Sequence, residues 1–428
     1  MFLVVIPAKA GIQKYAWIWT PVPKVRRTPS EDPFRGIRGS DVRAIFKSLV
    51  ACLQMLMNSI IDGLKRYFHL PRERAILLCG VLSLAALAAE RVLSPVDRKP
   101  RRIEFAAARL MERAIDIVRE EYTRRGFQFD AGVDPNHTAL VGPEYTDITT
   151  TLGSVEAKRT TTNPNMARVV VQLLQEAGVK PRDTIAVGCS ASFPALLIAT
   201  LAAAQAMDIH PVIILSLGSS SYGATRSDFN LLDVYEALLR KGWVAMPPEA
   251  SSLGGARDIG GDYEPDVRDR LIARIREMGI RFLYEPDLQR NVAQRMALYL
   301  GPALNRRIAA FINIGGSYAE LGTSPLVLKL EPGLNMHAVL PTAKETQGVV
   351  FHMMEHHIPV VHLLHIRSLT IKYGLPWDPI PLPKAGADGS AHRGFEPPTS
   401  TWIIAAVYIS LMMSIFVLHR KAFFRRLF

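Results

Sequence analysis

The segment that decides the fold spans residues 184–217 and reads TIAVGCSASFPALLIATLAAAQAMDIHPVIILSL. Thr184–Gly188 is a short run of small and apolar residues, which is typical of a buried strand. The turn after it contains Ser192, which is predicted to cap a helix that continues to Met207. Residues 211–217 form a second apolar run. This order of strand, helix and strand predicts a βαβ unit and therefore a parallel sheet.

The same alternation continues on both sides of this unit. A helix leading into the domain is predicted from Glu104 to Arg125, where Gly126 ends it. The remaining expected helices span residues 165–177, 228–241, 265–278 and 287–300, and the remaining strands span residues 280–284 and 308–314. Short apolar runs that alternate with capped helices are typical of a sheet covered on both faces. We therefore predict an α/β fold with a doubly wound, mostly parallel sheet.

Two hydrophobic segments bracket this domain. Ala75–Ala89 runs for fifteen residues without a charge, and Trp402–Leu418 runs for seventeen. Lys and Arg flank both segments, and such basic flanks are typical of the cytoplasmic side of a membrane. We therefore predict a protein of the bacterial inner (plasma) membrane that contacts the lipid bilayer, with both termini cytoplasmic and the main domain extracytoplasmic. Because the first segment is short for a span of about 20 residues, a cleaved signal peptide ending at Ala86-Leu87-Ala88 is the alternative.

The first fifty residues do not read like the rest of the chain. Residues 5–13, VIPAKAGIQ, are followed by scattered Pro and Arg without a sustained period. Because this opening resembles a translated intergenic repeat, we predict that the true start is Met55 or Met57. The expected organisation is then an extension at 1–54, a basic leader at 55–74, a transmembrane helix or signal anchor at 75–93, the α/β domain at 94–375, a Pro/Gly-rich linker at 376–400, a transmembrane helix at 401–418 and a basic tail at 419–428.

The charge distribution argues against a nucleic-acid partner. The whole chain has a formal net charge of +12, but residues 94–400 contain 33 Lys and Arg against 33 Asp and Glu. The basic excess therefore lies at the two ends, where the membrane flanks account for it. Of the three cysteines, only Cys189 lies in the domain, so a disulfide within the domain is excluded.

Three loops rich in Ser and Gly follow predicted strands and form the candidate ligand site. Parallel sheets place ligands at the carboxyl ends of their strands, where small residues let a ligand approach the backbone and hydroxyl groups donate hydrogen bonds. A helix N-terminus after the first loop favours negative charge. We therefore expect a polar, anionic ligand, although Gly and Ser also suit ordinary tight turns. The candidate ligand-binding residues are Gly188, Ser190, Ser192, Ser219, Ser220, Ser221, Gly315, Gly316 and Ser317.

The first of these loops also contains two candidate nucleophiles, Cys189 and Ser190. They lie on a strand-to-helix turn, but the turn lacks the final Gly of the hydrolase elbow, and no His can be assigned as their base. The chain has no phosphate loop ending in Gly-Lys-Ser/Thr, so nucleotide hydrolysis is unsupported and no cofactor is expected.

A metal site is a weaker alternative. His352, Glu355 and His356 fit the inverted zincin pattern, with His357, His362 and His365 nearby. These residues lie in the apolar run 349–364, which Pro359 interrupts, so a helix and a buried strand explain them more simply. Two acidic loops, one with Glu144 and Asp147 and one with Asp258, Asp262 and Glu264, are expected to face solvent.

Four motifs together resemble the poly-γ-glutamate system proteins, a bacterial family encoded beside poly-γ-glutamate ligase and capsule-type export genes. They are the turn Gly188–Pro194 with its flanking strands, Ser219–Gly223, Asn313–Ser317 and Tyr373–Pro381. The resemblance covers about residues 70–420, including both hydrophobic segments, and leaves out the opening of the chain.

The resemblance implies an accessory role in the synthesis, export or retention of an anionic polyamide at the cell surface. It also implies partners among the other proteins of that system and contact with polyglutamate itself, but it supplies no catalytic residues. The alternative from the residues themselves is an extracytoplasmic hydrolase or transferase that uses Cys189 or Ser190. The balanced charge of the domain favours a localised site over a broad polyanion-binding face.

Overall fold

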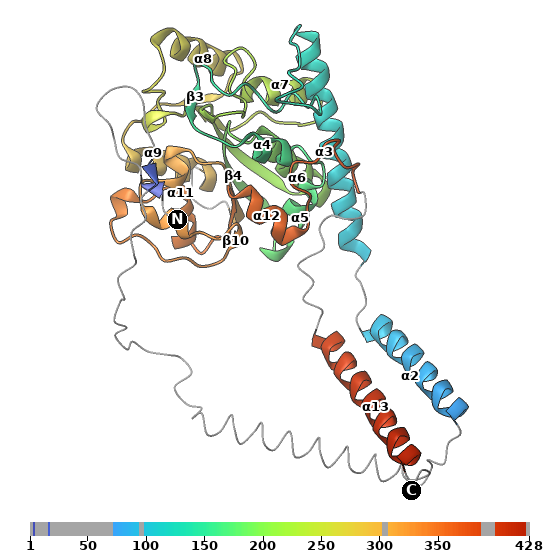
Figure 1. The fold of residues 1–428 in the computed structure, drawn as a ribbon. Coiled ribbons are helices and arrows are strands. Elements are labelled where there is room, and N and C mark those ends of the chain that lie inside the picture. The colour runs from blue at the N-terminus through green and yellow to red at the C-terminus, as the bar shows by residue number, and fades with distance from the viewer. Residues whose placement is uncertain are drawn as a thin grey trace. The chain divides into compact units, whose positions relative to one another are not determined.

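The computed structural model describes residues 3–4, 16–17, 72–93, 98–301, 307–386 and 399–424. These residues belong to two units, Leu93–Ser400 and a second unit that combines Met1–Val92 with Thr401–Phe428. The larger unit contains the α/β domain (Figure 1). The predicted fold class is confirmed for this domain.

The central sheet has seven strands in the order β10-β11-β9-β4-β5-β7-β8. All neighbouring pairs are parallel except β10 with β11. Its strands are β4 (Thr184–Ser190), β5 (His210–Ser216), β7 (Ala250–Ser252), β8 (Arg281–Leu283), β9 (Ile308–Ile314), β10 (Gly333–Asn335) and β11 (Val360–Leu363). The sequence pattern missed β7 and β10, which have three residues each. β8 is equally short but lies within the predicted strand at 280–284.

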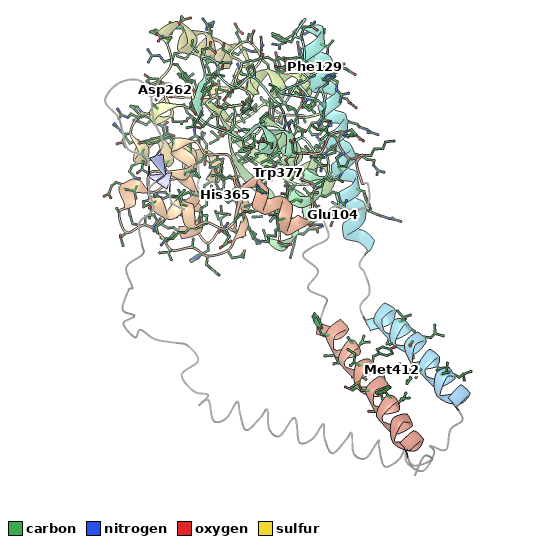
Figure 2. All side chains as sticks on the ribbon, viewed as in Figure 1. Glu104, Phe129, Asp262, His365, Trp377 and Met412 are labelled. Carbon is green, nitrogen blue, oxygen red and sulfur yellow. The ribbon has the colours of Figure 1, made fainter. Side chains whose placement is uncertain are left out.

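Helices cover both faces of this sheet (Figure 1). One face packs against α3 (Arg98–Arg124), α5 (Met166–Glu176), α6 (Pro194–Met207), α7 (Leu231–Arg240), α8 (Pro265–Glu277) and α12 (Ile366–Tyr373). The other face packs against α9 (Leu288–Leu300), α10 (Tyr318–Leu321) and α11 (Val349–Glu355). Strand residues alternate between the two cores, with Val187 facing the first and Ala186 the second. Side chains fill the space between the sheet and both helical layers (Figure 2).

A small parallel pair lies beside the main sheet. It joins β3 (Thr149–Thr151) to β6 (Ser219–Ser220), and α4 (Val155–Thr161) follows β3 after three residues. Three short 3-10 helices, η1 (Ala256–Asp258), η2 (Pro325–Lys329) and η3 (Lys344–Thr346), complete the domain. After α12, the chain stays on the domain as far as the described residues extend: Asp378 pairs with Arg159 at 2.6 Å, and the N–H of Gly386 donates to Asn165.

The second unit contains β1 (Leu3–Val4), β2 (Ala16–Trp17), α2 (Arg72–Leu93) and α13 (Thr399–Phe424). The two helices coincide with the hydrophobic segments of the sequence, and the Ser83 and Tyr408 hydroxyls join them at 2.8 Å. In the part of the chain that the structure describes, no helix is long and apolar enough to cross a membrane. Membrane spanning by these segments stays a prediction.

Candidate functional site

The chain changes direction in the sheet at the boundary between β4 and β9. From β4 it proceeds to β5, β7 and β8 on one side, and β9 and β11 then continue on the other side of β4. Open α/β sheets bind ligands outside the carboxyl ends of their strands at such a topological switch point. The first predicted loop begins inside β4, because Gly188, Cys189 and Ser190 are the last three residues of that strand, and the third loop follows β9 directly. Both therefore border this point.

Ser192 brings all three predicted loops together. A Cβ placed on Gly315 would lie 3.4 Å from the Cβ of Ser192, and the Ser192 Oγ accepts a hydrogen bond from the N–H of Ser220 at 3.0 Å. The prediction that Ser192 caps the following helix is wrong. Phe193 is the N-cap of α6, and its side chain has no acceptor for a capping bond. The hydroxyl of Ser192 accepts from the second loop instead.

Other predicted ligand-binding residues are engaged inside the protein. A Cβ on Gly188 would lie 2.4 Å from the carboxyl carbon of Glu320, so Gly188 is needed to let that side chain approach the strand. The Ser219 hydroxyl donates to the carbonyl of Ala191 at 3.1 Å, and the Ser221 hydroxyl donates to that of Thr151 at 3.4 Å.

Only some of the predicted ligand-binding residues remain at the rim of the switch point. Ser220 is half-buried, Gly316 is exposed, and Ser192 and Ser317 are 9% and 8% exposed. Ser317 caps α10 by accepting from the N–H of Glu320. Their role in binding a ligand stays a prediction.

The structure adds Lys158 to this group. Lys158 lies on α4, which the small β3–β6 sheet holds beside the second loop. Gly153, between β3 and α4, makes the approach possible, since a Cβ there would lie 2.8 Å from the carbonyl oxygen of Ser221 and 3.3 Å from Cε of Lys158. As a result, the Lys158 ammonium group donates to the Ser192 carbonyl and lies 2.6 Å from the Ser220 Oγ.

Lys158 is buried without a counter-charge. Its residue is 2% exposed, and among the described residues no carboxylate forms an ion pair with it. Burial disfavours the charged form and lowers the pKa of Lys158 to about 7. The face of Phe193, whose centroid is 3.8 Å from Nζ, favours the charged form. A lysine in such surroundings exchanges its proton near neutral pH, which makes it a candidate functional residue.

Little in the amino-acid sequence singles out Lys158. It lies in a polar stretch, TTTLGSVEAKRTTTN at 149–163, where a lysine is ordinarily expected to face solvent. The helix cap at Ser154 is visible in that stretch, but the partners of Lys158 are 34 and 62 residues away.

Among the described residues, no hydrogen bond joins either predicted nucleophile to a basic side chain. Cys189 is 1% exposed, its Sγ contacts the carbonyl of Ser190, and burial raises the pKa of its thiol. Ser190 is 3% exposed and donates to the carbonyl of Ile314 at 3.4 Å. The geometry therefore does not support nucleophilic catalysis by either residue.

The histidine-rich segment forms the helix and strand expected from its apolar pattern, α11 and β11. His352 Nδ1 lies 3.7 Å from Glu355. His362 is fully buried, its Nδ1 lies 3.0 Å from the amide nitrogen of Asn313, and burial lowers its pKa to about 4. Within the described ranges, no three His, Cys, Asp or Glu side chains are placed to hold a metal ion.

The acidic loop at residues 258–264 was expected to face solvent, and for Asp258 that prediction is wrong. Asp258 is fully buried and pairs with Arg295 at 2.7 Å, and Glu320 pairs with the same guanidinium group at 2.7 Å. Ser216 and Ser252, at the ends of β5 and β7, also contact Arg295. This Arg295 network closes the carboxyl ends of these strands on the face opposite α6.

One cavity of about 440 Å³ lies elsewhere, between α3 and α7. Its lining mixes Glu120 and Glu121 with Arg124, Arg240 and Lys241. Because these charges already pair with one another across the cavity, it offers no site of one sign.

No family model, no curated protein and no solved structure matches this chain, so its membership in the poly-γ-glutamate system family stays a prediction from its motifs.

Proposed function

We propose that this protein is an accessory component of bacterial poly-γ-glutamate synthesis, export or retention, and that its α/β domain binds a carboxylate-bearing segment of the polymer. The four sequence motifs support the pathway. The convergence of three Ser- and Gly-rich loops on Ser192 supports the site, because three of the four motifs that resemble the family contain these loops.

The chemistry of this edge suits a carboxylate. In the described part of the chain, the backbone N–H groups of Ser192 and Phe193 donate no hydrogen bond, and they precede the first turn of α6. Free N–H groups at a helix N-terminus favour an anion. Lys158 adds a positive charge whenever it is protonated.

The proposal places the second unit at the inner membrane, with both termini cytoplasmic and the domain outside. Its support is the basic flanks of the two hydrophobic segments and the apolar side chains that α2 and α13 expose. On α2 these are Ile76, Leu77, Val81, Leu84 and Leu87, and on α13 they are Trp402, Ile403, Val407, Ile409, Met413 and Phe416.

The pathway is tested by quantifying glutamate polymer released from the cell surface by acid hydrolysis, in the parent strain and in a strain that lacks this gene. We expect the polymer to be lost in the deletion strain and restored by the intact gene. Unchanged polymer in the deletion strain would exclude the polyglutamate assignment.

The site is tested by titrating the purified full chain with γ-linked glutamate oligomers in a calorimeter. We expect binding that weakens at least tenfold in Ser192→Ala, because this change disconnects the first loop from the second. Ser227→Ala removes a partly exposed hydroxyl that bonds only to Asp147, so it serves as the matched control. Equal affinity of all three proteins would exclude this site.

A further inference from the structure

We propose that Ser220 and Lys158 form a catalytic dyad in which Ser220 is the nucleophile and Lys158 its general base, acting on an amide or ester carbonyl. The two residues come from separate elements, β6 and α4, and their reacting atoms are 2.6 Å apart. That separation is within reach for direct proton transfer. The assignment depends on the proposed function only for the identity of the acyl donor.

The surroundings of Lys158 hold its amine in the orientation that a base requires. The protonated amine donates to the Ser192 carbonyl and to Oγ of Ser220. In the neutral amine one N–H can keep the bond to the Ser192 carbonyl, so the nitrogen lone pair is free to accept the proton of the Ser220 hydroxyl. Burial without a counter-charge keeps a large fraction of the amine neutral near pH 7. The Phe193 ring then stabilises the ammonium group that forms when the proton is transferred.

Ser220 also differs from its neighbours in exposure. Ser219 and Ser221 are 0% and 1% exposed and direct their hydroxyls to backbone carbonyls, whereas Ser220 is only half-buried. Ser220 is therefore the one of these three serines that solvent reaches. The N–H groups of Ser192 and Phe193, which donate no hydrogen bond to a described residue, lie on the adjacent loop as donors for the developing oxyanion.

The reaction balances without a cofactor. The Ser220 proton moves to Nζ of Lys158 while Oγ forms a bond to the carbonyl carbon, and the leaving amine or alcohol takes that proton as its bond to the carbon breaks. Water or a second amine then attacks the carbonyl carbon of the acyl-serine ester and gives a proton to Lys158. The bond from that carbon to Oγ breaks, Lys158 returns the proton to Oγ of Ser220, and a free acid or a new amide is released. Hydrolysis and transfer differ only in this second nucleophile.

The dyad is tested by treating the purified full chain with a fluorophosphonate probe and, separately, with p-nitrophenyl acetate. The modified residue is then mapped by mass spectrometry. We expect Ser220 to be modified, with a rate that rises with pH around 7, and we expect Ser220→Ala to abolish modification. Lys158→Met and Lys158→Arg should each lower the rate at least 100-fold, because neither side chain can accept a proton in this range. Ser227→Ala, from an exposed neighbouring loop, should keep the parental rate.

A cysteine nucleophile in place of Ser220 distinguishes loss of the base from misfolding of the variant. Ser220→Cys should react with iodoacetamide faster in the Lys158 background than in the Lys158→Arg background, while circular dichroism shows both proteins folded. No modification of Ser220 by either reagent in folded protein, or equal rates with and without Lys158, would overturn the dyad. If the deletion strain loses the polymer but Ser220 is not modified, the pathway assignment is kept and the dyad is rejected. If Ser220 is modified but the polymer is unchanged, the dyad is kept and the pathway assignment is rejected.

Discussion

Lys158 and Arg295 are both buried cations beside the carboxyl ends of the central strands, but their surroundings are opposite. Arg295 lies between the carboxylates of Asp258 and Glu320, each at 2.7 Å. Among the described residues, the polar and aromatic partners of Lys158 are a carbonyl, a hydroxyl and an aromatic ring. Burial acts to lower the pKa of Arg295, but the two carboxylates raise it by a larger amount. The net pKa is above the ordinary value, so the guanidinium group stays charged. The pKa of Lys158 falls to about 7. A buried cation that is paired with carboxylates stays charged and stabilises the fold, whereas a buried cation without such partners has a lowered pKa and can exchange its proton.

The largest expected effect is on the neutralised cation. Arg295→Met leaves Asp258 and Glu320 buried without their partner, and breaking a buried ion pair costs about 3–5 kcal/mol of unfolding free energy. Urea unfolding of the purified chain measures this. Arg290→Met, on the same helix but with a side chain 72% exposed, should change stability by less than about 0.5 kcal/mol. Equal losses in the two variants would contradict the structural role of Arg295.

Lys158 makes stability depend on pH in the opposite sense from a lysine whose pKa is raised by an ion pair. Its folded pKa of about 7 lies below the ordinary value of 10.5, so between these values the unfolded chain binds more protons. The free energy of unfolding should therefore rise with pH from 7 to 10, by at most about 1.4 kcal/mol per unit. Lys158→Met should remove this component, whereas Lys180→Met, which changes an exposed lysine, should keep it. Parallel pH profiles for the parent and Lys158→Met, from urea unfolding at several pH values, would show that Lys158 keeps its ordinary pKa.

Gly188 tests the contact between β4 and the Arg295 network. In Gly188→Ala the new methyl group would overlap the Glu320 carboxyl group, and we expect a loss of about 1–3 kcal/mol from overpacking. Gly316→Ala meets only the flexible end of Leu321, at 3.2 Å, so its loss should stay below about 1 kcal/mol. Thermal unfolding of both variants gives the comparison, and a larger loss for Gly316→Ala would mean that Gly188 is not confined by Glu320.

The smallest effect is expected at Cys189. Cys189→Ala removes a buried sulfur next to Ser190, which costs about 1 kcal/mol, and it should leave the modification of Ser220 unchanged. The rate of fluorophosphonate labelling checks this directly. A lower labelling rate in Cys189→Ala than in the parent would indicate that Cys189 acts as a nucleophile.

The sequence pattern predicted long elements better than short ones. β9 has the predicted bounds, and β4, β5 and the helices differ from prediction by a few residues at their ends, because runs of seven or more residues show a clear period. β7 and β10, with three residues each, are strands only because neighbouring strands offer hydrogen bonds to them. Their assignment therefore depends on tertiary pairing.

The candidate site was predicted in part. The three loops could be located because parallel strands all end at one edge of the sheet, and they do meet there at Ser192. What each hydroxyl does in the loops could not be predicted, since Ser192 bonds to Ser220 rather than capping α6, and Ser219 and Ser221 bond to carbonyls.

Local periodicity and composition established the α/β class, the positions of the strand-end loops and the charge balance of the domain, and both can be read along the chain. Tertiary structure alone decided which charges are buried and whether they are neutralised. Arg295 is 37 residues from Asp258 and Lys158 is 62 residues from Ser220, so their environments exist only after the chain has folded. A pKa depends on those environments, and a pattern of residue types along the chain does not contain them.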